Sequence, residues 1–177
     1  MTDTGGGFAP GIGNSTNYRA CSGFQCVIAE VPTITAVLST SSINLGTLSS
    51  ASVSTQSHTI SVTTNVGGYT TTVIEDGELR IGTADITQVG DGFVTANSEE
   101  YGLATSETGR DITQDTDCSN SPYNASGITG SVQTVAGHAG PTYTAETTTL
   151  CYAASITGNT GAGTYQHILT YITTGSF

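Results

Sequence analysis

The chain has 177 residues and a mass of 17.9 kDa, a size that suits one domain, with or without an arm. It contains 34 threonines and 19 serines, only 10% charged residues and no lysine; the net charge is −11, and the cations are Arg19, Arg80 and Arg110. Nucleic acids and anionic membranes are bound through clustered Lys and Arg, so we expect neither as a partner. No apolar run is long enough to predict a membrane span.

The beginning of the chain predicts an arm. Residues 1–17 (MTDTGGGFAPGIGNSTN) are rich in glycine and offer little to bury, so this stretch is expected to be ordered only where something holds it. We predict a Gly-rich N-terminal arm over residues 1–30, which includes a disulfide loop, and a β-domain over residues 31–177. No charged segment followed by an apolar core opens the chain, so we expect a secreted protein whose signal has been removed.

The next segments are typical of short strands. Residues 27–40 are extended but interrupted by Pro32, which a central strand does not tolerate. Residues 58–74 (HTISVTTNVGGYTTTVI) are two alternating runs joined at 65–68, which predicts a β-hairpin, and 75–78 form a turn of the Asp-Gly type. In the first run one face carries His58, Ile60, Val62 and Thr64, and in the second run one face carries Tyr69, Thr71 and Val73.

The alternation then weakens and returns. Residues 83–147 are rich in Gly, Asp, Asn and Thr, and we interpret them as a long loop-rich insertion with short strands. Strand patterns return in residues 147–158 and 163–177. In the last segment Ile168 and Ile172 lie opposite an apolar face that carries Tyr165, His167, Leu169 and Tyr171. Apolar residues on both faces predict a strand that is buried on both sides or packs against a second molecule.

These elements favour an all-β fold, because helix formers are scarce and no segment keeps apolar residues at helical spacing. About eight or nine short strands separated by turn signals predict an immunoglobulin-like two-sheet sandwich with the insertion described above. A closed barrel is the alternative.

Four cysteines form an even set, as is common in secreted proteins. Three pairings are open; we favour Cys21 with Cys26 and Cys118 with Cys151. Free thiols and a zinc site are the alternatives, although no C-x-x-C pair is present. Asn14 and Asn124 open two N-x-S/T sequons and are candidate glycosylation sites.

Four phrases of this sequence resemble a known group of proteins. They are INLGTL (43–48), TISVTTN (59–65), GYTTTV (68–73) and AGTYQHILTY (162–171). In this order they resemble secreted bacterial β-sandwich domains of the pilin-like or spore-coat-protein-U-like kind. The resemblance implies a surface or extracellular role and assembly by donation of a strand between copies.

Few residues suggest chemistry. Asp111, Asp115 and Asp117 lie close together in one loop and are weak candidates for calcium; no other metal or cofactor is expected. His138 lies in a Gly-rich loop and is the histidine most worth testing as a base, whereas His58 and His167 lie in alternating strands. No nucleophile elbow, zinc-protease helix or phosphate-binding glycine motif is present, so we do not expect an enzyme. A pair of acids for glycoside cleavage, converging from distant positions, stays an alternative.

Two kinds of function follow from these patterns. The first is the repeating subunit of an extracellular filament or surface layer, a homopolymer in which the arm with the following segment (residues 1–38), or else the terminal strand (164–174), completes the sheet of a neighbour. The second is a monomeric cell-surface adhesin or carbohydrate-binding module whose region 83–147 binds a glycan or host-surface ligand. Its aromatic contacts would be Tyr101, Tyr123 and Tyr143.

Overall fold

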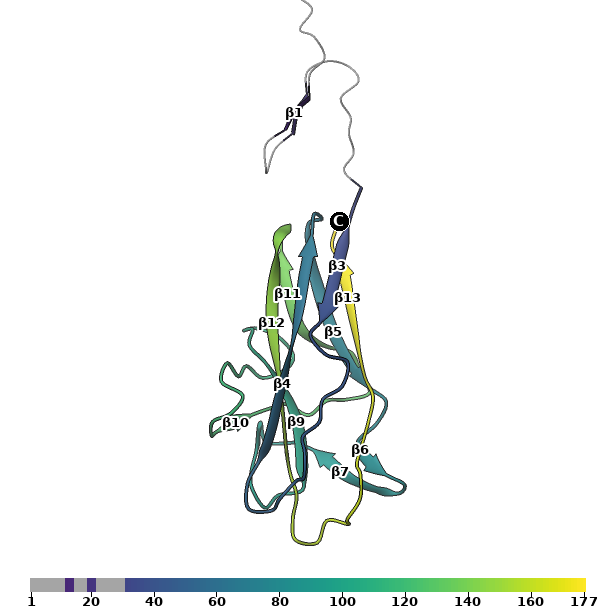
Figure 1. Ribbon diagram of the computed structural model, residues 1–177, viewed down its shortest axis with the longest axis vertical. Coiled ribbons are helices and arrows are strands. Elements are labelled where there is room, and N and C mark those ends of the chain that lie inside the picture. The colour runs from purple at the N-terminus through teal and green to yellow at the C-terminus, as the bar shows by residue number, and fades with distance from the viewer. Residues whose placement is uncertain (1–11, 15–18, 22–30) are drawn as a thin grey trace, which may run out of the picture. The chain divides into compact units, whose positions relative to one another are not determined.

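The computed structural model describes residues 12–14, 19–21 and 31–177 (Figure 1). The chain divides into two units, residues 1–31 and 32–177. In the first unit β1 (Ile12–Asn14) pairs antiparallel with β2 (Arg19–Cys21). The predicted Cys21–Cys26 pairing and most of the Asn14 sequon lie outside the described residues.

The second unit is built from β-sheets, and the described residues contain no helix, so none that could cross a membrane. A six-stranded sheet has the spatial order β3 (Ile34–Leu38), β4 (Ser54–Thr64), β12 (Thr142–Ser155), β9 (Glu100–Thr105), β7 (Ala84–Gln88) and β6 (Leu79–Ile81). A three-stranded sheet has the order β11 (Gln133–Ala139), β5 (Gly68–Glu75) and β13 (Leu169–Gly175). A short ladder joins β8 (Phe93–Val94) to β10 (Tyr123–Asn124). The all-β prediction is confirmed.

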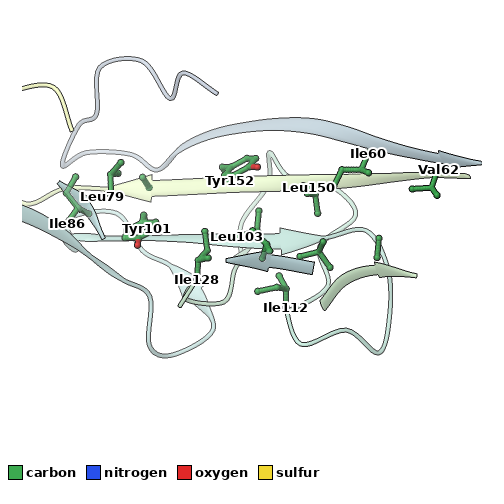
Figure 2. Close-up of a cluster of buried hydrophobic side chains, with 14 of the residues drawn as sticks. Ile60, Val62, Leu79, Ile86, Tyr101, Leu103, Ile112, Ile128, Leu150 and Tyr152 are labelled. Carbon is green, nitrogen blue, oxygen red and sulfur yellow. The ribbon is translucent and has the colours of Figure 1, made fainter. Parts of the chain in front are cut away.

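One buried cluster, part of which Figure 2 shows, draws on strands of both larger sheets. The six-stranded sheet supplies, among others, Ile60, Leu103 and Leu150, and the three-stranded sheet supplies Tyr69 and Val73; all five are at most 2% exposed. The sequence explains this burial, because alternate residues of a strand point to the same face. The faces predicted for β4 and β5 are both buried in the core.

The predicted hairpin over residues 58–74 is wrong. Its two runs form β4 and β5, but β4 pairs with β3 and β12, whereas β5 pairs with β11 and β13. The connection therefore crosses from one sheet to the other. Gly68, with a φ of 139°, makes this crossing possible, because a side chain there would collide with the carbonyl oxygen of His138. Alternation reports which face is buried and does not identify the partner strand.

The interpretation of residues 83–147 as an insertion is also wrong. The segment contains β9, which lies between β12 and β7 inside the larger sheet, and β11, which pairs along β5. β9 has no alternating pattern because five of its six residues are buried. One of them is Gly102, and a side chain there would collide with Ala125 and Val89. A strand that is packed on both faces loses the periodicity by which strands are recognised.

Candidate interaction site: the free edges of β3 and β13

Each of the two larger sheets ends in a strand that has one free edge. Among the strands that the structure describes, β3 pairs with β4 alone and β13 pairs with β5 alone. We call these two free edges, over residues Ile34–Leu38 and Leu169–Gly175, the edge pair. A free edge presents backbone N–H and C=O groups that another strand can bind.

The hydrogen bonds at the ends of β3 show which of its backbone groups lie on the free side. The carbonyl of Thr33 accepts from Asn65, and the N–H of Ser39 donates to Thr59, so odd-numbered residues face β4. In an antiparallel ladder this orientation alternates along the strand. The backbone groups of Ile34, Ala36 and Leu38 therefore point away from β4, toward the free side.

The same argument applies to β13. The N–H of Ser176 donates to Gly68 and the carbonyl of Ile168 accepts from Asp76, so even-numbered residues face β5. The pairing between β13 and β5 is continuous over all seven residues of the strand. The backbone groups of Leu169, Tyr171 and Thr173 consequently lie on the free edge.

The side chains on the core side of both strands remain partly in solvent. Ile34, Ala36 and Leu38 stand opposite the buried residues Thr64, Val62 and Ile60 of β4, so their side chains are on the core face. Even so, Ile34 is 37% exposed and Leu38 is 40% exposed. All five residues of β3 are exposed. On β13 the core-facing residues Leu169, Tyr171 and Thr173 are only half-buried.

The two edges belong to neighbouring strands. The Cδ1 atom of Ile34 lies 3.8 Å from the position that a Cβ atom on Gly175 would take. The first residue of β3 is thus beside the last residue of β13, and Figure 1 shows the two strands running in opposite directions. A strand placed between them would be antiparallel to one and parallel to the other. Neither β3 nor β13 contains a charged residue.

A buried polar network lies behind β13. The hydroxyl of Tyr152 on β12 is 2.6 Å from that of Tyr171 on β13 and 3.2 Å from Nε2 of His58 on β4. Burial lowers the pKa of His58, against a smaller opposing effect of the Thr40 backbone. Burial also raises the pKa of Tyr171 to about 12, although its hydrogen bond with Tyr152 acts in the opposite direction. The network joins the free-edge strand β13 to the larger sheet.

The calcium candidates are each bound to their own surroundings. Asp111 accepts hydrogen bonds from the backbone and hydroxyl of Thr134. Asp115 accepts from the N–H groups of Asp117 and Cys118, and Asp117 accepts from Ser119 and Asn120. Within the part of the chain that the structure describes, no three His, Cys, Asp or Glu side chains are grouped as a metal ion requires.

Of the histidines and tyrosines that the sequence singled out, His167 and Tyr101 meet at one buried carboxylate, with ring centroids 5.1 Å apart. Oε2 of buried Glu75 lies 2.6 Å from the Tyr101 hydroxyl and 3.4 Å from Nδ1 of His167. Tyr101 is only 3% exposed, so its prediction as a ligand contact is wrong; burial and then the Glu75 hydrogen bond raise its pKa. His138 pairs with Glu146 on the surface.

Two further predicted sites are placed by the structure. Cys118 and Cys151 form a disulfide, which ties the loop before β10 to β12. Asn124 lies half-buried in β10, beside an open hollow of about 350 Å³. All of the residues that line this hollow except Pro122 are polar: Gln114, Asp115, Thr116, Asp117, Asn120, Ser121, Pro122 and Asn124.

Sequence reasoning missed where the open edges would lie. The terminal segment 164–174 was a candidate donor, but its strand, β13, pairs with β5 of its own chain. The isoleucines on its outer face were the available signal, since Ile168 is 65% exposed and Ile172 is 51% exposed.

No protein-family model, curated protein or solved structure matches this chain.

Proposed function

We propose that this chain is the structural subunit of an extracellular filament or surface layer, in which each copy accepts an extended segment of a neighbouring copy at its edge pair. The fold that accepts this segment is a pilin-like, immunoglobulin-like sandwich with one strand position left open. The Cys118–Cys151 disulfide supports a location outside the cytosol, where disulfides persist.

One observation carries the proposal: apolar side chains of β3 are exposed although they point to the core side of the sheet. Ile34 and Leu38 could be buried only by another segment, and the free N–H and C=O groups of the same residues offer that segment hydrogen bonds. The free groups of Leu169, Tyr171 and Thr173 do the same on β13. Main-chain pairing of this kind supplies affinity, while alternate side-chain contacts supply specificity.

The N-terminal arm of a neighbouring copy is the donor that the sequence favours. It directly precedes β3, and residues 27–31 (VIAEV) place Val27, Ala29 and Val31 on one face when extended. Residues 34–38 are not available as a donor, because they pair with β4 of their own chain. The arm contains only three charged residues, Asp3, Arg19 and Glu30, so most of it can lie beside uncharged strands.

The test introduces proline at the free edge. Ala36→Pro removes an N–H that points away from β4 and so leaves the β3–β4 ladder intact, as edge prolines do. We expect the wild-type chain to form filaments or sheets in electron micrographs at high concentration and the variant to form neither, with a native circular dichroism spectrum.

The matched control is Ala139→Pro, at a residue of β11 that is exposed on the other edge of the smaller sheet. This control should assemble like the wild type. Equal assembly of both proline variants, or a wild-type chain that is monomeric at every concentration, would refute the filament proposal. A monomer that instead bound saccharides at the hollow beside Asn124 would favour the adhesin hypothesis.

A further inference from the structure

Two strands of the smaller sheet, β5 and β13, have an uncharged outer surface. Even-numbered residues of β5 and β13 lie on the side away from the core, and we call the six of them that carry a side chain the outer face: Thr70, Thr72, Ile74, Thr170, Ile172 and Thr174. They pair across the two strands as Ile74 with Thr170, Thr72 with Ile172, and Thr70 with Thr174. The result is a regular array of methyl and hydroxyl groups, with Ile172 51% exposed.

Charged groups border the outer face. Along β11, Arg110 pairs with Glu107 and donates to the carbonyl of Gly137, and Asp111 binds Thr134. At the end where β13 begins, Asp76 pairs with Arg80 and accepts the N–H of Ile168. In a chain of net charge −11, two copies repel each other over most of their surfaces. They repel least where such an uncharged face meets its own copy.

We propose that the outer face is a self-association surface, at which two copies of this chain pack sheet against sheet. The contact is self-complementary, because both partners present the same array of threonine and isoleucine side chains. A nucleic acid would need cations that the face lacks. A bilayer would need more than the two large apolar side chains it offers.

The size of the face sets the strength of this contact. Two strands of about seven residues cover roughly 200–300 Å², from a rise of about 3.3 Å per residue and a strand spacing of about 4.8 Å. A stable dimer buries about 800 Å² per partner. The contact is therefore weak between single copies and becomes effective only where many copies are held in a row. It does not require strand donation, and it would add lateral contacts to filaments if these form.

The larger sheet provides a comparison within the same molecule. Its outer positions are also hydroxyl-rich, but Ser61 and Thr147 already bond each other across β4 and β12, at 2.9 Å. Thr147 is exposed and lies on β12, which belongs to the larger sheet. Thr147→Lys and Ile172→Lys both change the net charge from −11 to −10, so the two variants are matched in charge and alter different faces.

The experiment follows backbone amide chemical shifts of the full chain as protein concentration rises, at low and at high salt. To separate this contact from strand donation, the series is run in the Ala36→Pro background and, at concentrations below assembly, in the wild type. We expect concentration-dependent shifts confined to the outer face and larger at high salt, because salt screens the repulsion between copies. Ile172→Lys should abolish these shifts, and Thr147→Lys should leave them unchanged although it reduces the negative charge equally.

The two proposals fail in different ways. Shifts that persist in Ile172→Lys, or that map to other residues, overturn the outer-face proposal whatever happens to filaments. Absence of concentration-dependent shifts in all variants overturns it too. Filaments that form normally from Ile172→Lys but no longer lie side by side in micrographs would support it, and loss of filaments in Ala36→Pro tests strand donation alone.

Discussion

The centre of the larger sheet and the edge pair use the same kinds of residue with opposite results. Leu103 on β9 and Leu150 on β12 are fully buried, whereas Leu38 on β3 is 40% exposed although its side chain is also on the core face. The difference lies in the neighbours, because β9 and β12 are each flanked by strands on both sides. An apolar side chain stabilises this fold only where a strand covers it, so the edge pair is where the molecule could gain most from a partner.

The largest test of this comparison truncates one leucine in each region. Leu103→Ala should lower the free energy of unfolding by about 4 kcal/mol, because a fully buried leucine leaves a cavity that the neighbouring strands cannot fill. Leu38→Ala should cost about 1 kcal/mol or less in the monomer, since much of this side chain is already in water. Urea unfolding at a concentration without assembly measures both. Equal losses would mean that the edge pair is closed in solution.

The disulfide provides a second test, because it ties the loop before β10 to β12 in the centre of the larger sheet. Replacing Cys118 and Cys151 together by alanine should lower stability by about 3 kcal/mol, because the bond closes a long loop, with a sequence separation of 33, in the unfolded chain. Thermal unfolding of the double variant and of the wild type gives this difference. Replacement of Cys21 and Cys26 together by alanine is the control. If the variant without Cys118 and Cys151 were as stable as the wild type, the assignment of the Cys118–Cys151 disulfide would be contradicted.

The smallest expected effect is a pH dependence of the free energy of unfolding that comes from His58. Its side chain belongs to the buried network that joins the larger sheet to β13. Since burial holds its folded pKa below the ordinary value of about 6.5, the unfolded chain binds a proton more readily. Stability is therefore complete above about pH 6.5 and falls as the pH drops toward the folded pKa, by at most about 1.4 kcal/mol per pH unit.

His58→Gln isolates this effect, because carboxylates that titrate below about pH 5 act on both proteins alike. Unfolding curves between pH 5 and pH 8 should be flatter for the variant than for the wild type. Parallel curves would show that His58 is solvated in the native state.

Individual elements show how far sequence reasoning extends. The buried faces of β4 and β5 were readable because a half-buried strand alternates in polarity. β9 was not readable, since Gly102 and Ala104 are buried in a strand packed on both faces. Of the proposed site, Ile172 of β13 and Ile168 just before the strand were visible in the sequence as exposed isoleucines. At β3 the only signal was Pro32, which a central strand does not tolerate, because the residues ITAVL themselves resemble those of a covered strand.

The sequence by itself determined an all-β chain with a hydroxyl-rich, lysine-free surface, because β propensity, alternation and charge are local properties of the residues. The tertiary structure alone decided that β4 and β5 belong to different sheets and that β3 and β13 each keep a free edge. Strand pairing joins segments far apart in the chain, and backbone hydrogen bonds are the same for every residue type except proline. Which strand lies beside which is therefore settled by the packing of the whole core.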